Sequence, residues 1–156
     1  MRITEVSQDC IDLVKKFEGF SAKPYLCPAK VPTIGYGTTI YPNGQRVRLT
    51  DKPITEAEAK DILKHELNEF AKRVDAITID TINQSQFDAL TSFAYNIGAG
   101  ALRTSTLLKR VNANPNDKNI KSHFMKWVNA NGKVLNGLVN RRQAEADLYF
   151  KQWTLK

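Results

Sequence analysis

A glutamate, a cysteine and a threonine near the N-terminus have the spacing of residues that could act together in hydrolysis. Glu18 stands between Phe17 and Phe20, Cys27 follows on a predicted loop, and Thr33 opens a glycine-spaced strand. In the last turn of a predicted helix, the helix dipole opposes an ionised carboxylate, and the phenyl rings oppose it by desolvation. A carboxyl group that keeps its proton near neutral pH is suited to general acid catalysis. The alternative is an exposed glutamate with no chemical role.

The strand that begins at Thr33 has features that suit a sugar-binding surface. Gly35 and Gly37 weaken a strand unless another group must approach its backbone closely. The Thr33 hydroxyl could hydrogen-bond a water molecule. Three tyrosines nearby could offer rings and hydroxyls to a sugar, or could simply pack within a sheet: Tyr25, Tyr36 and Tyr41. These residues indicate a hydrolytic site but do not identify its substrate.

The elements that must position these residues are mostly helical. Ser7 caps a first helix that is expected to end near Glu18, before Gly19. A capping box at Thr55 begins a helix of about 18 to 20 residues, judged from its apolar spacing. Further helices are predicted from Asn83 to Gly98, from Ser105 through Val111, around Ile120 to Val128, and from about 138 to 150.

A small antiparallel sheet is predicted near the N-terminus. The runs 33–41 and 45–49 are rich in β-branched and aromatic residues, and Asn43-Gly44 between them is a strong hairpin signal. The sum is one α+β domain over residues 1–156. We expect a sheet-bearing lobe at about 20–55, a linking helix at about 55–74, and a helical lobe at about 80–156 plus the first helix. A cleft between two lobes is a common place for a site.

The composition is that of a domain that can fold without disulfide bonds or structural metals. The chain has 156 residues, of which 42% are hydrophobic and 25% are charged. It has no apolar run of membrane-spanning length, and acidic residues interrupt its N-terminal apolar positions, so we expect a protein made in the cytoplasm. Cys10 and Cys27 form no metal-binding pattern, and His65 and His123 stand alone, so neither a metal nor a cofactor is expected.

Positive charge is concentrated in the second half of the chain. The formal net charge is +7, and residues 103–142 carry nine Lys or Arg and one acid, Asp117. Such a segment favours an anionic partner such as nucleic acid, an anionic membrane or cell wall, or it is a solvated surface with no partner. Charge alone does not choose among these.

The residue pattern resembles a known family. Glu18, eight residues, Cys27, five residues and Thr33, followed by IGYG, is similar to the catalytic motif of phage-type lysozymes, glycoside hydrolase family 24. The segments 86–98, 105–108 and 137–145 also resemble that family, so the similarity covers about residues 7–150. The resemblance implies a lysozyme-like fold with two lobes around a cleft.

The resemblance also implies an activity and its residues. It implies an endolysin that cuts the β-1,4 bond between N-acetylmuramic acid and N-acetylglucosamine in peptidoglycan, with Glu18 protonating the leaving oxygen. Cys27 and Thr33 would handle the attacking water, although most relatives have Asp at the position of Cys27. It further implies a monomer that is attracted to the anionic cell envelope without stable membrane insertion. Such an enzyme would leave the host cytoplasm through a separately made membrane hole.

Several alternatives remain open at this stage. A lytic transglycosylase would cut the same bond without water, and a wall-binding module would not cut it at all. A nucleic-acid binder is not expected, because the chain has no recognition motif of that kind. A disulfide between Cys10 and Cys27 would block the site as a redox switch. Arg141 and Arg142 either reach Glu18 or the cleft, or are surface charges on the last helix.

Overall fold

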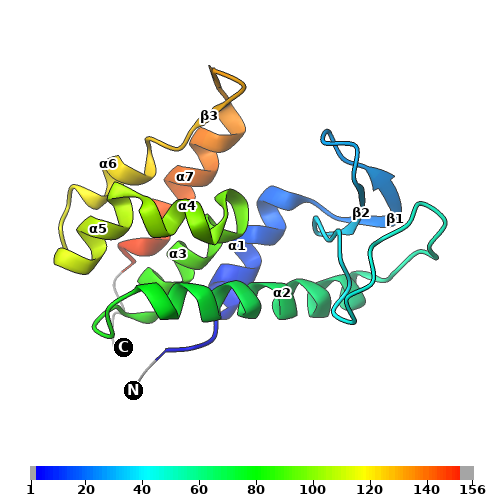
Figure 1. The fold of residues 1–156 in the computed structure, drawn as a ribbon, viewed down its shortest axis with the longest axis horizontal. Coiled ribbons are helices and arrows are strands. Elements are labelled where there is room, and N and C mark those ends of the chain that lie inside the picture. The colour runs from blue at the N-terminus through cyan, green and yellow to red at the C-terminus, as the bar shows by residue number, and fades with distance from the viewer. Residues whose placement is uncertain (1–2, 152–156) are drawn as a thin grey trace.

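The computed structural model describes residues 3–151, which form a mostly helical fold with two small antiparallel sheets (Figure 1). The elements in chain order are α1 (Gln8–Glu18), β1 (Ser21–Leu26), β2 (Pro32–Gly35), α2 (Glu56–Ile77), α3 (Gln84–Ile97), α4 (Ala99–Thr104), α5 (Thr106–Ala113), α6 (Ile120–Phe124), β3 (Asn129–Ala130), β4 (Lys133–Val134) and α7 (Asn136–Tyr149). The α+β class predicted from the sequence is confirmed. Residues 152–156 of the predicted helical lobe lie outside the described residues.

The first helix ends at Glu18, as predicted. Gly19 follows with φ of 70°, in the left-handed region that glycine adopts without strain, and its N–H donates to the carbonyl of Lys15. Ser7 precedes the helix but makes no side-chain cap, because its hydroxyl donates to Asp88 of α3 instead. The end of α1 therefore places the Glu18 side chain at the junction between the helices and the sheet.

A small antiparallel sheet near the N-terminus is present, as predicted, but its strand β1 was not predicted from the sequence. β1 pairs with β2, and Tyr25 lies opposite Thr33. The predicted continuous strand 33–41 is wrong, because Gly35 and Gly37 take φ of 65° and 82° and turn the chain back on itself. The Asn43-Gly44 turn is present, but only Ile40 and Arg46 pair across it, so the predicted hairpin is reduced to a single bridge.

The long helix α2 connects the two ends of the molecule. It runs 22 residues, slightly longer than predicted, and the capping box of Thr55 and Glu58 is present. The β1–β2 sheet lies at the N-terminal end of α2, and helices α3 to α7 gather over its other half (Figure 1). The structure therefore has a sheet part and a helical part joined along α2 and α1.

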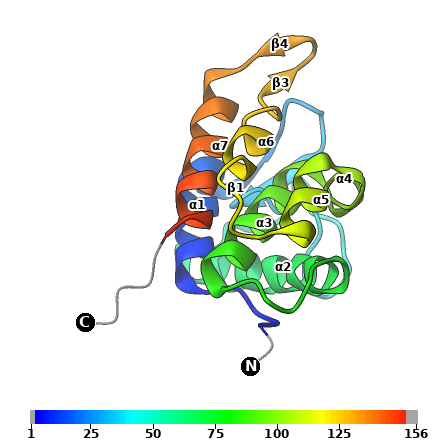
Figure 2. The same ribbon diagram turned by 90° about the vertical axis from the view of Figure 1, so that its left-hand side faces the viewer.

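Helix α3 forms the centre of the helical part. It is buried along almost its whole length, and it contacts α1, α2, α4 and α7. Figure 2 shows α1 and α7 side by side, with α2 running beneath the bundle. A helix that is surrounded in this way can place side chains toward several neighbours at once. Within residues 3–151 no helix is long and apolar enough to cross a membrane.

The segment between α6 and α7 is a short hairpin that the sequence did not predict. Asn129–Ala130 pairs with Lys133–Val134, and the turn between them contains Asn131 and Gly132, both with positive φ. In Figure 1 this hairpin rises from the helical part, opposite the β1–β2 sheet. Helix α4 was also not predicted, because its six residues have no apolar period of their own.

Candidate active site

Glu18 has a basic partner from the far end of the chain. Arg141 of α7 donates from Nη1 to Oε1 of Glu18 over 2.8 Å. The Glu18 side chain is 24% exposed and that of Arg141 only 4%, so the ion pair lies at the edge of the interior. The Arg141 guanidinium also lies 5.9 Å from the centre of the Phe17 ring. The carboxyl group is therefore held in one place by a charged hydrogen bond.

A buried network holds Arg141 from behind. Arg141 Nε donates to Oε2 of Glu145 over 3.4 Å, and the Ser92 hydroxyl donates to the same oxygen over 2.6 Å. Arg142 pairs with the other oxygen of Glu145, which is completely buried. Burial lowers the pKa of Arg142, and the charge of Glu145 opposes that effect. Two guanidinium groups and one carboxylate thus share the interior beside Glu18.

A second carboxylate approaches Glu18 from α2. The Tyr95 hydroxyl donates to Oε2 of Glu66 over 3.0 Å and lies 3.2 Å from the carbonyl oxygen of Tyr36. Burial raises the pKa of Glu66, whereas the hydroxyls of Thr38 and Tyr95 lower it. Among the described residues, the buried Oε1 of Glu66 has no hydrogen-bond partner. This carboxyl group is therefore poorly solvated when it is ionised.

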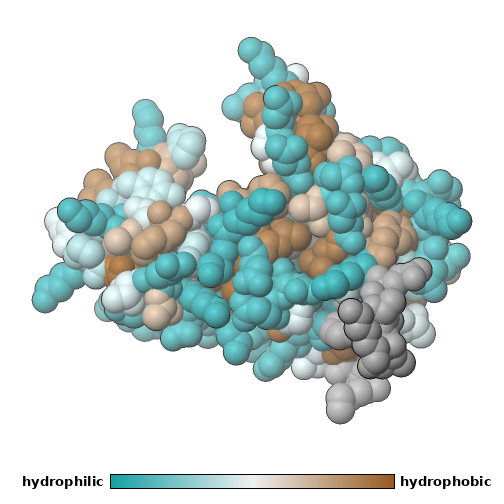
Figure 3. All heavy atoms as spheres, turned by 180° about the vertical axis from the view of Figure 1, so that it is seen from behind, coloured by the Kyte–Doolittle hydropathy of each residue, from teal (hydrophilic) through white to brown (hydrophobic). Residues whose placement is uncertain are grey.

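Two cavities meet at Glu18. One of about 520 Å³ is lined by Glu18, Asn96, Arg141, Phe17, Leu135, Asn136, Gly137 and Leu138. The other, of about 370 Å³, is lined by Glu18, Gly37, Thr39, Glu66, Phe70, Tyr95 and Asn96. Because Glu18 and Asn96 line both, the two cavities form one cleft. Figure 3 shows the hollow between the two raised parts of the molecule.

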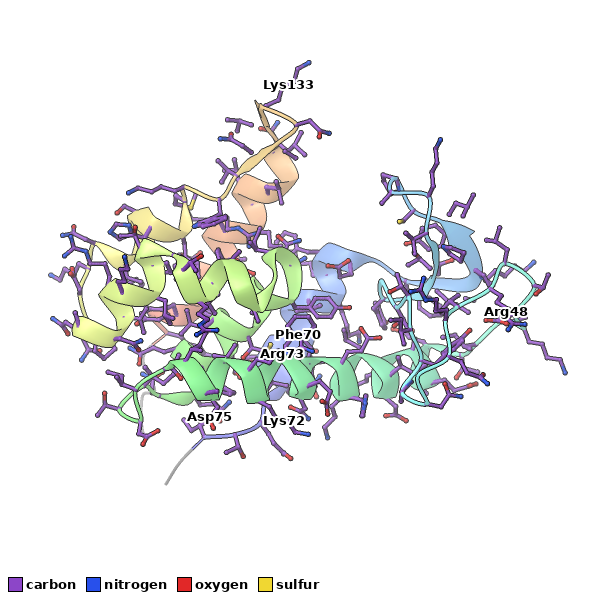
Figure 4. The ribbon with its side chains drawn as sticks, viewed as in Figure 1. Arg48, Phe70, Lys72, Arg73, Asp75 and Lys133 are labelled. Atoms are coloured by element: carbon purple, nitrogen blue, oxygen red, sulfur yellow. The ribbon has the colours of Figure 1, made fainter. Side chains whose placement is uncertain are left out.

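A third cavity extends the cleft along α2. It measures about 350 Å³ and shares Thr39, Glu66 and Phe70 with its neighbour. Phe70 and Arg73 stand together on α2, with the guanidinium carbon 5.1 Å from the ring centre (Figure 4). The combined cleft is an elongated groove with Glu18 in its middle part, which suits a chain-like ligand better than a compact one.

Cys27 and Thr33 lie together on the sheet part. Backbone hydrogen bonds, chiefly that of Val31, lower the pKa of the Cys27 thiol, and the Thr33 side chain adds to this effect. Thr33 is almost completely buried, and its hydroxyl donates to the carbonyl of Val31 over 2.9 Å. Neither residue lines the two cavities that contain Glu18. The structure thus brings Cys27 to Thr33, and Glu18 to a different set of residues.

The other residues singled out from the sequence have definite places. Tyr36 is buried and donates to Glu56 over 2.7 Å, and burial raises the pKa of Tyr36 to about 12. Tyr36 therefore packs within the fold and does not offer a face to a sugar. Cys10 is fully buried, and it and Cys27 are free thiols, so the structure does not contain the disulfide that was left open as an alternative. The sequence left open whether Arg141 and Arg142 reach Glu18; of the two, only Arg141 contacts it.

Sequence reasoning did not find three residues of this site. Glu145, Glu66 and Asn96 come from α7, α2 and α3, and no local spacing connects them to Glu18. The one available signal was the glutamate four residues after Arg141, which predicts a pair on one helix face. The contact of Glu66 and Asn96 with the cleft depends on helix packing and has no local signature.

Comparisons with known proteins identify related sequences and structures. The family model described as Phage lysozyme matches residues 15–145. An endolysin of Acyrthosiphon pisum secondary endosymbiont phage 1 is 35% identical, over 92% of this chain and 97% of that protein. The structure of an endolysin from Escherichia coli O157:H7 phage FAHEc1 superposes with a TM-score of 0.87, at 34% identity and full coverage of both chains.

Other relatives are longer than this chain. An endolysin of Bacillus phage B103 is 42% identical over 149 residues, which are 92% of this chain but 53% of that protein. The chain therefore spans about half the length of the Bacillus phage endolysins that it matches.

Proposed function

Because this chain belongs to the phage lysozyme family, we propose that it is a peptidoglycan hydrolase that cuts the β-1,4 bond between N-acetylmuramic acid and N-acetylglucosamine. The observation that carries the proposal is the place of Glu18. It is a carboxyl group at the meeting point of two cavities, fixed by the buried Arg141. An elongated groove around such a group suits a glycan strand with its scissile bond beside Glu18.

In the first step Glu18 acts as the general acid. Its carboxyl proton passes to the glycosidic oxygen, and the bond from that oxygen to the anomeric carbon breaks. Glu18 then carries a negative charge that the Arg141 guanidinium, 2.8 Å away, stabilises. Burial, and with it the charge of Glu18, raises the pKa of the Glu66 carboxyl in the same cavity.

In the second part of the reaction Cys27 and Thr33 handle the attacking water. The lowered pKa of the Cys27 thiol raises the share of thiolate, which can accept a proton from water. Thr33 stands beside it and orients the water through its hydroxyl oxygen. The water attacks the anomeric carbon from the face opposite the leaving group, as in inverting glycosidases.

The setting follows from the endolysin relatives and from the charge of the surface. We expect a monomer, made in a host cytoplasm and released through a separate membrane hole, that lyses the host from the cell wall. Arg141 and Arg142 are buried in the site and are not part of the basic surface. The other basic residues of the segment 103–142 are exposed: Arg103, Lys109, Arg110, Lys118, Lys121, Lys126 and Lys133. Figure 4 shows Lys133 at the tip of the β3–β4 hairpin. They favour binding to an anionic envelope that weakens with salt.

Product analysis of digested peptidoglycan tests the proposal. The wild type is expected to release fragments with N-acetylmuramic acid at the new reducing end and with one water added to each cleaved bond. Glu18→Gln keeps the size of the side chain but carries no proton to donate, so its rate is expected to fall by at least about 100-fold. Anhydro products would contradict hydrolysis and would identify the protein as a lytic transglycosylase. Binding to cell walls without any new reducing end would indicate a wall-binding module.

A further inference from the structure

The side chain of Asn96 is fixed by an arginine that the proposed mechanism does not use. Arg142 is completely buried, and each of its nitrogens has an acceptor. Nε donates to the carbonyl of Trp127 over 2.9 Å, Nη1 donates to Glu145, and Nη2 donates to Oδ1 of Asn96. A guanidinium group has five N–H donors and no acceptor. Only the oxygen of the Asn96 amide, and not its nitrogen, can therefore face Arg142.

The orientation of the amide group has a consequence for the cleft. When Oδ1 faces the interior, the NH₂ group on the other side of the same planar amide faces outward. Asn96 is exposed, and it lines both cavities that meet at Glu18. No hydrogen bond donated by the Asn96 amide nitrogen occurs within residues 3–151. The protein thus presents a fixed, unused N–H donor next to the general acid.

We propose that Asn96 is a specificity residue that donates a hydrogen bond to an amide carbonyl of the bound glycan strand. This inference rests on the proposed function, because it needs a peptidoglycan strand in the cleft. Such a strand carries amide carbonyls in two places near a scissile bond: the acetamido groups of its sugars, and the amide that joins the stem peptide to muramic acid. Carbonyl oxygens accept from N–H groups and are absent from plain polysaccharides. Asn96 would therefore favour N-acetylated or peptide-bearing glycans over unmodified ones.

The buried support makes this donor selective. A donor that keeps one orientation loses little conformational freedom on binding, so most of the hydrogen bond contributes to affinity. A ligand that lacks the carbonyl would leave the donor without its partner while still displacing water from it. We expect discrimination of about tenfold for this one contact.

Asn96→Asp tests the hydrogen-bond donor apart from the contact of this side chain with Arg142. The substitution keeps the size of the side chain and an oxygen toward Arg142, but it removes the NH₂ group. Asn96→Ala removes the donor without adding a charge. Asn140→Asp on α7 is the matched control, because it introduces the same charge on an exposed residue next to Arg141 that lines neither cavity. Each is combined with Glu18→Gln, so that binding to uncleaved strands is measured by cosedimentation.

Three substrates identify the carbonyl: intact peptidoglycan, chemically N-deacetylated peptidoglycan, and glycan from which an amidase has removed the stem peptides. With Asn96 present, affinity is expected to fall about tenfold on one of the two altered substrates, which names the source of the carbonyl. Both Asn96 variants should bind intact peptidoglycan about tenfold more weakly and show no further loss on that altered substrate. Asn140→Asp should behave like its parent.

Two results would overturn this inference. One is that the Asn96 variants bind intact peptidoglycan as tightly as their parent. The other is that they lose the same additional factor on each altered substrate as the parent does. These two results can be distinguished from a failure of the proposed function. In that case the protein with Glu18 intact would produce no new reducing ends from peptidoglycan. Thermal unfolding of each variant excludes loss of the fold as the cause of weak binding.

Discussion

Glu18 and the pair Cys27 and Thr33 are close in sequence but are held in place in different ways. Glu18 is fixed by side chains from distant helices, and its partner Arg141 lies 123 positions away along the chain. Cys27 and Thr33 are fixed by the backbone of their own short hairpin, in which the Cys27 N–H donates to the carbonyl of Val31 over 3.1 Å. The helical part therefore positions the proposed acid through packing, and the sheet part positions the proposed water-handling pair through local geometry.

The difference predicts where each side is vulnerable. A network of buried charges is strongly destabilised when one member is removed, because its partners remain buried and unpaired. A residue held by backbone hydrogen bonds within one loop can be exchanged with a smaller effect on the rest of the fold. We expect substitutions on the Glu18 side to change stability and activity together, and substitutions of Cys27 to change activity alone.

The largest effect is expected from Glu145→Ala. Glu145 is completely buried and pairs with Arg141 and Arg142, so its removal leaves two guanidinium groups with one carboxylate fewer. Breaking a buried ion pair typically costs about 3–5 kcal/mol of the free energy of unfolding. Chemical denaturation of the variant and the wild type measures the loss.

Two controls sharpen this comparison. Asp147→Ala, at an exposed position on the same helix, should change the free energy of unfolding by less than about 0.5 kcal/mol. Thr33→Val removes the hydroxyl that donates to the carbonyl of Val31 in the sheet part, and it should cost about 1 kcal/mol. If Glu145→Ala costs no more than Thr33→Val, the contrast between the two regions is wrong.

This contrast also explains how far the sequence could predict the site. Cys27 and Thr33 could be proposed from the sequence because their relation to Glu18 is a spacing within one short segment, and their place in the site stays a prediction. The helix from Thr55 was predicted from its capping box and apolar period, and the helix from Asn83 from its apolar period, because these signals are local. Glu66 and Asn96 could not be predicted, because the packing of α2 and α3 against α1 brings them to Glu18. The predicted strand 33–41 failed because the two glycines turn the chain there.

The second prediction concerns Cys27. If its thiolate accepts the proton of the water, Cys27→Ala should lower the rate of hydrolysis about 100-fold, and Cys27→Asp should lower it less because a carboxylate can serve as the base. Both variants should keep the stability of the wild type to within about 0.5 kcal/mol. Release of reducing ends from purified peptidoglycan measures the rate. Equal and full activity in both variants would remove Cys27 from the mechanism.

The third prediction uses Gly37, where the two regions meet. A Cβ atom at this position would lie 2.9 Å from Oε2 of Glu18, and φ is +82°. Gly37→Ala should cost about 1–2 kcal/mol for the left-handed backbone. It should also lower activity by about tenfold or more, because Glu18 must move away from its place beside Arg141.

Gly132→Ala in the β3–β4 hairpin is the matched control for the backbone cost. Gly132 has φ of +77°, and a Cβ atom there would meet nothing within 4 Å. The two variants should therefore lose similar stability by chemical denaturation, while only Gly37→Ala loses activity. A similar loss of activity in both would show that the backbone strain, and not the contact with Glu18, is responsible.

The smallest expected effect is a dependence of stability on pH that arises from Glu66. Burial raises the pKa of Glu66 in the folded protein, so protonation of this carboxyl favours folding. That stabilisation is fully present below the ordinary carboxyl pKa and is lost as pH rises through the raised value. Glu66→Gln stays neutral at every pH. Its Tm relative to that of the wild type should therefore increase between about pH 4 and pH 7.

Glu69→Gln on the same helix should give the opposite sign. Glu69 is exposed, and its hydrogen bond with Lys72 lowers the pKa of the Glu69 carboxyl, so ionisation favours folding there. The Tm of Glu69→Gln relative to that of the wild type should fall slightly over the same pH range, because only the wild type gains the ionised pair. Calorimetry of the three proteins at several pH values measures both trends. Parallel curves for the two variants would contradict a raised pKa of the Glu66 carboxyl in the folded protein.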